Sequence, residues 1–238
     1  MTGPGPRTPG DELLLARISA AAGRERLGRR CATYKGVAHT PHAKTPPVRA
    51  VRRLLAQVRH GGPAAARERD DARLDLYERG MTVAVKGRIH VVRYDTTSVF
   101  RTSPPRPYDP SRGGGACTLT DVTGRRVVLR GGPEQGDEAR WWEGIERGVS
   151  RAQLPAALAA LDRGERLTFG DVWLTSEELG RGEIRVPWSR VRRVRLRDGS
   201  VELDVDGTWH GPGSTASEVP NPFVLRALVE HLGPDGAR

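Results

Sequence analysis

A weak internal repeat between Leu76 and Leu232 constrains the fold of this chain more than any other feature of its sequence. In each copy an aromatic residue and a glycine, Tyr77 and Gly80 in the first and Phe169 and Gly170 in the second, precede short strand-like segments, a turn, a further strand and a helix. Tyr94 in the first copy and Trp188 in the second hold equivalent places, which favours packing in a core as their role. Antiparallel strands that end in a helix, twice over, predict two small curved sheets, each closed by a helix at one end.

The predicted fold class is α+β, mainly β, with two such units after a basic, partly helical N-terminal arm. We expect the arm over residues 1–73, the first unit over 74–162, the second unit over 163–233 and a tail over 234–238. A single mixed α+β domain, or one barrel of about eight to ten strands, would use the same elements.

Local signals place several elements within this plan. Lys86-Gly87 joins two strand-like runs as a short turn, and Pro222–Leu232 has the apolar spacing of a closing helix. The segment Thr102–Gly115, with four prolines and three consecutive glycines, is expected to be a long mobile loop. The helix that opens near Trp141 is expected to leave that side chain partly exposed and to break or kink near Pro155.

The excess positive charge is concentrated at the N-terminal end of the chain. Residues 1–70 contain 14 Lys and Arg against 5 Asp and Glu, a net charge of +9 out of +10 for the whole chain. Only three of the 39 basic residues are lysines, and such an arginine bias is by itself poor evidence for nucleic-acid binding. Two helices are expected in the arm, one after Asp11 and one over Val48–Arg59. The arginines beside the apolar stripe of the second helix are candidate contacts for an anion, namely Arg49, Arg52, Arg53 and Arg59.

A second group of arginines lies on the strand expected over Val191–Arg197. Because side chains alternate between the two faces of a strand, Arg193, Arg195 and Arg197 share one face. Guanidinium groups pair well with phosphate and carboxylate, so this face is a candidate platform for an anion. A solvated edge strand, whose arginines prevent edge-to-edge aggregation, would produce the same pattern.

The sequence offers little that supports catalysis or metal binding. Two cysteines far apart make no metal-binding or disulfide framework, and reduced thiols are expected. The pair His39 and His42 lacks a second pair at zinc-site spacing, although Cys31 and His60 are near in sequence. No nucleophile motif of the GxSxG kind occurs, and the glycine runs lack the following Lys-Ser or Lys-Thr of a phosphate-binding loop. We therefore expect no enzyme, no cofactor and no metal.

Several of these segments together resemble a bacterial family of PH-like proteins that is known only as a domain of unknown function. The resemblance extends over about Arg17 to Leu232 and is strongest from Leu74 onward. It is carried by the segments Gly80–Val85, Leu167–Gly170, Val186–Val191 and Val219–Leu225. The resemblance implies a PH-like fold, twice in tandem, with no catalytic residue to carry over. Such a fold serves lipid, peptide and scaffold functions alike, so it does not choose among them.

The function expected from the sequence is therefore binding. The first hypothesis is a non-catalytic PH-like interaction module for a protein or peptide, or for an anionic partner such as a lipid headgroup. The first alternative is a nucleic-acid-associated protein that uses its basic arm, and the second is an unrecognised hydrolase. No stretch approaches 18 consecutive apolar residues, so we expect a cytoplasmic protein with no transmembrane segment, whose membrane contact, if any, is peripheral.

Overall fold

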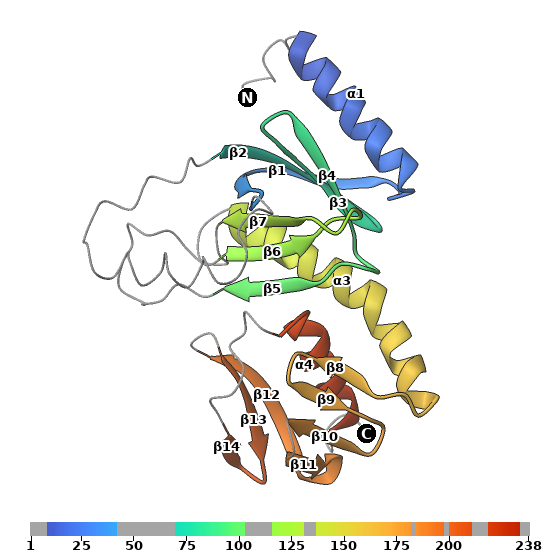
Figure 1. The fold of residues 1–238 in the computed structure, drawn as a ribbon, viewed down its shortest axis with the longest axis vertical. Coiled ribbons are helices and arrows are strands. Elements are labelled where there is room, and N and C mark those ends of the chain that lie inside the picture. Colours follow the sequence, from blue (N-terminus) through green and yellow to red (C-terminus); the bar gives the residue numbers. More distant parts are fainter. Residues whose placement is uncertain are drawn as a thin grey trace, which may run out of the picture.

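The structure, a computed structural model, describes residues 9–41, 70–102, 116–130, 137–181, 184–197, 200–210 and 219–233. Within these ranges the chain is α+β and mainly β, and its strands are all paired antiparallel. Strands β1 to β7 form one body and strands β8 to β14 form a second body below it in the view of Figure 1. The predicted fold class is confirmed at this level. None of the described helices is both long and apolar enough to cross a membrane.

The first body is a seven-stranded sheet in the order β4-β3-β2-β1-β7-β6-β5. The central strand β1 pairs with β2 on one side and with β7 on the other, so it joins a four-strand meander to a three-strand meander. Helix α3 (Asp137–Asp162) follows and packs on the sheet. The seven strands are β1 (Arg30–His39), β2 (Asp70–Tyr77), β3 (Gly80–Val85), β4 (Arg88–Arg93), β5 (Val99–Thr102), β6 (Ala116–Thr120) and β7 (Arg126–Arg130).

The position of β1 corrects the predicted extent of the N-terminal arm. Residues 30–39 lie at the centre of the sheet and β2 begins at Asp70, so the predicted boundary between residues 73 and 74 cuts through the first body. β1 has few large apolar residues, so it lacks the alternating apolar pattern of a strand. Its partner β2 begins 31 positions after the end of β1 at His39, so no short turn marks the pair either. The predicted helix Val48–Arg59 and most of the loop Thr102–Gly115 lie outside the described residues.

The predicted N-terminal helix is present as α1 (Pro9–Arg24) and covers the outer face of the sheet. Its C-terminal half buries Ile18, Ala21 and Ala22, and the two alanines form a small apolar cluster with Tyr77 and Val91 of the sheet. Its first turns are exposed, and the side chain of Leu13 is 63% exposed. The helix is therefore anchored at one end and overhangs the sheet at the other.

The second body repeats the order of elements of the first. A four-stranded sheet in the order β11-β10-β9-β8 is followed by a three-stranded sheet in the order β12-β13-β14 and then by helix α4 (Pro222–Leu232). The closing helix has the bounds predicted from its apolar spacing. The strands are β8 (Leu167–Phe169), β9 (Val172–Leu174), β10 (Glu178–Arg181), β11 (Ile184–Pro187), β12 (Val191–Arg197), β13 (Ser200–Val205) and β14 (Thr208–His210).

The aromatic residues of the repeat occupy matching places in the two bodies. Tyr94 follows β4 and Trp188 follows β11, which are the fourth strands of the two meanders, and the predicted burial of both side chains is confirmed. The predicted match of Gly80 with Gly170 is wrong. Gly80 begins the third strand of its meander, whereas Gly170 lies between the first and second strands of the other. The error has the same cause as the wrong boundary, because the first copy was counted without β1.

Helix α3 differs from its prediction in two respects. It continues without a break through Pro155, which lies on an exposed face. Trp141 is fully buried rather than partly exposed, with its ring centroid 6.3 Å from that of Trp142 at an interplanar angle of 76°. The reason is tertiary: α3 packs against the first sheet and also against α4 and β8, so more of its circumference is covered than one apolar stripe indicates.

One buried asparagine connects the two bodies. Asn221, at the start of α4, lies against the edge strand β5: its backbone N–H donates to the Val99 carbonyl at 2.8 Å, and its side-chain Oδ1 accepts from the Val99 N–H at 2.8 Å. Its Nδ2 donates to Gln153 Oε1 at 2.7 Å and to the Thr97 carbonyl at 3.2 Å. Gln153 of α3 in turn donates to the Tyr94 and Thr97 carbonyls. Both bodies and α3 thus share one hydrogen-bond network and one apolar core.

Candidate functional site

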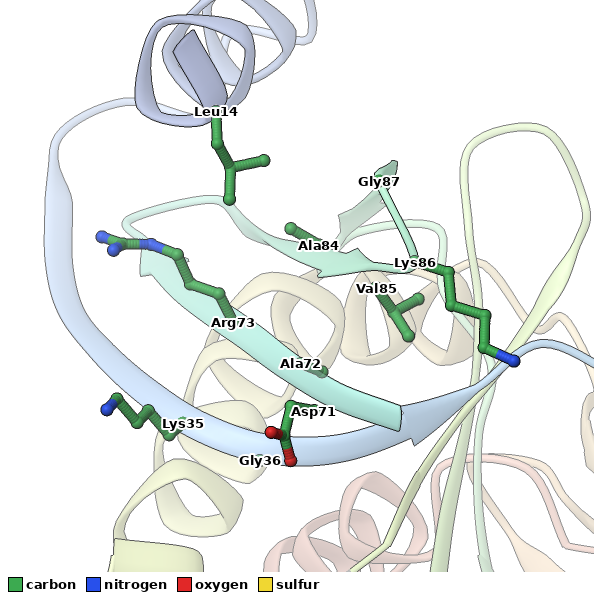
Figure 2. Close-up of a pocket in the computed structure, with 10 residues that line it drawn as sticks. All are labelled: Leu14, Lys35, Gly36, Asp71, Ala72, Arg73, Ala84, Val85, Lys86 and Gly87. Carbon is green, nitrogen blue, oxygen red and sulfur yellow. The ribbon is translucent and has the colours of Figure 1, made fainter. Parts of the chain in front are cut away.

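A hollow of about 430 Å³ lies on the outer face of the first sheet, beneath the overhanging end of α1. Figure 2 shows Leu14 reaching from α1 toward the sheet above Ala72 and Ala84. The lining is completed by one acidic and three basic side chains and by the β3–β4 turn, namely Lys35, Gly36, Asp71, Arg73, Val85, Lys86 and Gly87. Small side chains on the sheet and the overhang of α1 therefore create the space, and charged side chains surround it.

The β3–β4 turn fixes one side of the hollow. Lys86 and Gly87 both have positive φ, 47° and 70°, which is the type I′ geometry that suits a two-residue hairpin. A non-glycine residue such as Lys86 adopts this conformation at a cost in free energy. Arg17 of α1 donates from Nη2 to the Gly87 carbonyl at 3.1 Å, so the helix is attached to the turn at the mouth of the hollow.

The opposite side of the hollow is formed by neighbouring residues of β1 and β2. Lys35 and Arg73 are directly opposite each other in the ladder, and both belong to the set of side chains on the outer face. In Figure 2 the side chains of Lys35 and Lys86 extend on opposite sides of the hollow. A ligand in the hollow would therefore lie between two exposed ammonium groups, with Asp71 as the acidic member of the lining.

Arg73 is held in place by a buried carboxylate. Asp75 is completely buried, accepts from Arg73 Nε at 2.7 Å and Nη2 at 2.9 Å, and also accepts from the Thr33 hydroxyl at 2.6 Å. The hydrogen bonds that Arg73 donates to Asp75, stronger in effect than the desolvation that opposes them, raise the pKa of Arg73 above its ordinary value. Arg73 is therefore a fixed, charge-balanced part of the wall, and the two lysines are the other basic members of the lining.

The hollow contains no recognisable catalytic constellation. Burial raises the pKa of the Cys117 thiol, which lies in the core away from the hollow, and so removes it as a nucleophile. In the part of the chain that the structure describes, no group of three or more His, Cys, Asp or Glu side chains is placed to hold a metal ion. Of the residues considered for a metal from the sequence, Cys31 and His39 lie at the two ends of β1, and His42 and His60 are outside the described residues.

A buried His–Asp pair of the first body shapes a turn between two strands. His90 of β4 donates from Nδ1 to Asp121 Oδ2 at 2.8 Å, and both side chains are buried. Asp121 Oδ1 accepts from the backbone N–H groups of Thr123 and Arg125, which shapes the β6–β7 turn. Burial opposes ionisation of this carboxyl, but the hydrogen bonds from His90, Thr123 and Arg125 outweigh it and hold the pKa of Asp121 below its ordinary value.

This pair predicts acid sensitivity of the fold. Because the pKa of Asp121 is lower in the folded than in the unfolded chain, the ionised carboxylate stabilises the fold above about pH 4, and this contribution is lost as the pH falls through the folded pKa. The melting temperature of the protein is expected to fall as the pH is lowered over the interval below about pH 4. In Asp121→Asn the melting temperature should be lower at neutral pH but depend less on pH over that interval. An unchanged acid slope in this variant would contradict the prediction.

The structure places the arginines predicted as site residues in two different situations. Arg49, Arg52, Arg53 and Arg59 lie outside the described residues. The strand predicted over Val191–Arg197 is confirmed as β12. In its ladder with β13, Arg193 is opposite Asp204, Arg195 is opposite Glu202 and Arg197 is opposite Ser200. In the register of the ladder, an acidic residue is thus opposite two of the three arginines.

The hollow itself was missed from the sequence. Its members come from α1, β1, β2 and the β3–β4 turn, which no local motif connects. One signal was present: the chain has only three lysines, and two of them, Lys35 and Lys86, line the hollow. The third, Lys44, lies outside the described residues.

Residues 142–235 match a protein family that is described as a family of unknown function (DUF6585). The matched region begins within α3 and contains all of the second body. No curated protein matches the chain.

Proposed function

We propose that this chain is a non-catalytic interaction module built from two PH-like units, and that the hollow beneath α1 receives an anionic group of its partner. The PH-like assignment is supported by the order of elements, because each body has a four-strand meander, a three-strand meander and a closing helix. It agrees with the family resemblance seen in the sequence. A binding role is supported by the form of the site, which is an open hollow without a nucleophile or a metal-ligand group among the described residues.

The observation that best supports an anionic ligand is the position of the lysines. Lys35 and Lys86 are both exposed and border the same hollow, although this chain uses arginine at nearly every other basic position. Lys86 moreover occupies a backbone conformation that favours glycine or asparagine. A strained position that holds a lysine beside a hollow is consistent with selection for its charge rather than for stability.

The sequence between β1 and β2 is also strongly basic. β1 ends and β2 begins at the same end of the sheet as the Lys86–Gly87 turn, since Ala38 pairs with Asp70 and Ala72 pairs with Val85. Residues 42–69, which join these two strands in the sequence, contain seven basic residues and one acidic residue, a net charge of +6. Such a net charge favours an anionic partner, because a positive potential speeds its association.

A nucleic acid is the second candidate partner, because the same connection carries the arginines predicted as contacts. The affinity of such contacts depends on the number of phosphates that basic side chains neutralise, and it falls steeply with salt concentration. The two candidates differ in which residues matter. A partner of the hollow depends on Lys35 and Lys86, whereas a polyanion bound by the connection depends on residues 42–69.

Replacing the two lysines should separate binding from stability. Lys86→Asn relieves backbone strain and should leave the melting temperature unchanged or raise it, while Lys35→Gln on an exposed strand position should change stability by no more than about 0.5 kcal/mol. Together they are expected to weaken binding to vesicles that contain phosphatidylserine, or to a hexaglutamate peptide, about tenfold or more, at roughly 1 kcal/mol per charge. Equilibrium binding with both probes and with a DNA duplex measures the effect.

The matched control removes two charges from elsewhere on the same body. Arg125 and Arg126 are exposed at the β6–β7 hairpin, away from the hollow, and their change to Gln should alter binding less than threefold, or roughly 0.6 kcal/mol. Equal losses in the two double variants would overturn the hollow as the site. Binding only to DNA, abolished when residues 42–69 are replaced by a short glycine-serine linker, would favour the nucleic-acid function instead.

A further inference from the structure

The second body holds a buried tryptophan, Trp173, that has two arginines over its ring. Trp173 of β9 is 4% exposed, yet it belongs to neither of the two apolar clusters of the described residues. Its neighbours Val172 and Leu174 on the same strand face the core, so Trp173 lies on the opposite, outer face of the four-stranded sheet. Something other than the core therefore covers its ring.

The ring lies flat across the sheet because the neighbouring position has no side chain. Thr168, Trp173, Gly180 and Arg185 are in register across the four strands β8 to β11. A Cβ atom on Gly180 would collide with Cζ2 and Cε2 of the Trp173 indole. Gly180 thus lets the indole extend over β10 toward Arg185.

Two guanidinium groups are held over this ring. The Cζ atom of Arg166 is 4.0 Å from the ring centroid of Trp173 and that of Arg185 is 5.7 Å from it. Stacking of this kind uses the flat face of the guanidinium and leaves its N–H groups at the edge available for hydrogen bonds. Within the described residues Arg166 makes no ion pair, and Arg185, with its side chain 68% exposed, has one at 3.6 Å to Glu178.

We propose that Arg166 and Arg185, positioned by Trp173, bind a carboxylate of an acidic segment of a partner protein. Guanidinium groups that are already oriented lose less rotational freedom when they form bidentate hydrogen bonds with a carboxylate. The site is on an open sheet face rather than in a cavity, so it suits a group that a larger partner presents. The location also favours a peptide, because β11 is the edge of its sheet among the described strands and can pair with an added strand beside Arg185.

Conservative substitution tests the site with the net charge unchanged. Arg166→Lys and Arg185→Lys keep the positive charge but lose the stacking of a planar guanidinium on the indole and the bidentate hydrogen bonds to a carboxylate. In the full chain with Lys35→Gln and Lys86→Asn already present, so that the hollow makes no contribution, each change should weaken binding of a hexaglutamate peptide about fivefold or more. Arg190→Lys is the control, since Arg190 is 59% exposed and bonds Asp206 elsewhere on the same body, and it should bind as its parent does.

A spectroscopic signal at the ring gives a second measurement. The indole N–H resonance of Trp173, identified by its absence in Trp173→Phe, should shift on addition of the peptide and should not shift in the Arg185→Lys variant. Thermal melts verify that each variant is folded.

Equal peptide affinity in the lysine variants, or an indole resonance that never responds, would overturn the inference. Stronger binding to phosphatidylserine vesicles or to DNA than to the peptide, with the same loss in the lysine variants, would overturn the assignment to an acidic peptide. Because both lysines of the hollow are replaced in these measurements, a negative result for Arg166 and Arg185 does not contradict the function proposed for the first body.

Discussion

Replacing Asn221 with alanine is expected to destabilise the protein by about 3 to 5 kcal/mol. The change removes an acceptor from the Val99 N–H and a donor from Gln153 Oε1 and from the Thr97 carbonyl, at a position that is buried between the two bodies. Each buried group that loses its partner costs about 1 to 3 kcal/mol. Asn221 also has φ 48° and ψ 53°, a left-handed conformation that alanine adopts less readily. Urea unfolding measures the effect.

The matched variant Asn221→Gly separates the backbone from the side chain. Glycine adopts the left-handed conformation without strain. The difference in the free energy of unfolding between the two variants, about 1 kcal/mol, therefore measures the cost of this backbone conformation for alanine. The remaining loss belongs to the hydrogen bonds. A double-mutant cycle with Gln153→Ala should give a coupling energy of about 1 kcal/mol or more, since the two side chains share a 2.7 Å bond. Additive losses would show that the two bodies are not joined through this network.

Gly80→Ala is the second substitution for which we expect a large effect, a loss of about 3 kcal/mol or more. Its Cβ atom would collide with the Val92 carbonyl oxygen of the neighbouring strand and lie 2.8 Å from Leu27 Cδ2. The carbonyl belongs to the β3–β4 ladder and cannot rotate away, so the strands must separate. Overpacking that forces such backbone shifts typically costs about 1 to 3 kcal/mol and occasionally more.

The control for Gly80 is the glycine of α1. Gly23 has no atom within 4 Å of the place where a Cβ would lie, and it is in a helix. Gly23→Ala should therefore stabilise the protein by up to about 1 kcal/mol, since alanine has the higher helix propensity. The same chemical change at the two positions thus has opposite expected signs. A loss below about 1 kcal/mol for Gly80→Ala would mean that the close approach of Val92 is relieved in solution.

Recognition of elements from sequence succeeded where the signal lies within about ten residues. The Lys86-Gly87 turn, flanked by alternating apolar runs, was recognised because its chemistry and its strands are contiguous. The bounds of α4 were recognised because Pro222 marks its first turn and its apolar residues repeat at helical spacing. The burial of Tyr94 and Trp188 followed from their matching places in the repeat.

Recognition failed for elements whose burial depends on distant partners. Trp141 is fully buried, and α3 packs on the first sheet and on α4, contacts that have no signature in the sequence of α3. The hollow could not be assembled for the same reason. Its lysines are 51 positions apart in the chain, and only the placement of β1 beside β2 brings them to one face.

The sequence by itself determined the class of the fold, the repeated order of strands and closing helix in the second half, and the excess of positive charge near the N-terminus. Periodicity, turn chemistry and charge are local properties, and each residue carries them into any fold. The tertiary structure alone decided that residues 30–39 are the central strand of the first sheet, that α1 overhangs a hollow there, and that Trp173 lies beneath two arginines. These features depend on which surfaces meet across long stretches of chain, and that choice is made by the free energy of the whole packed core.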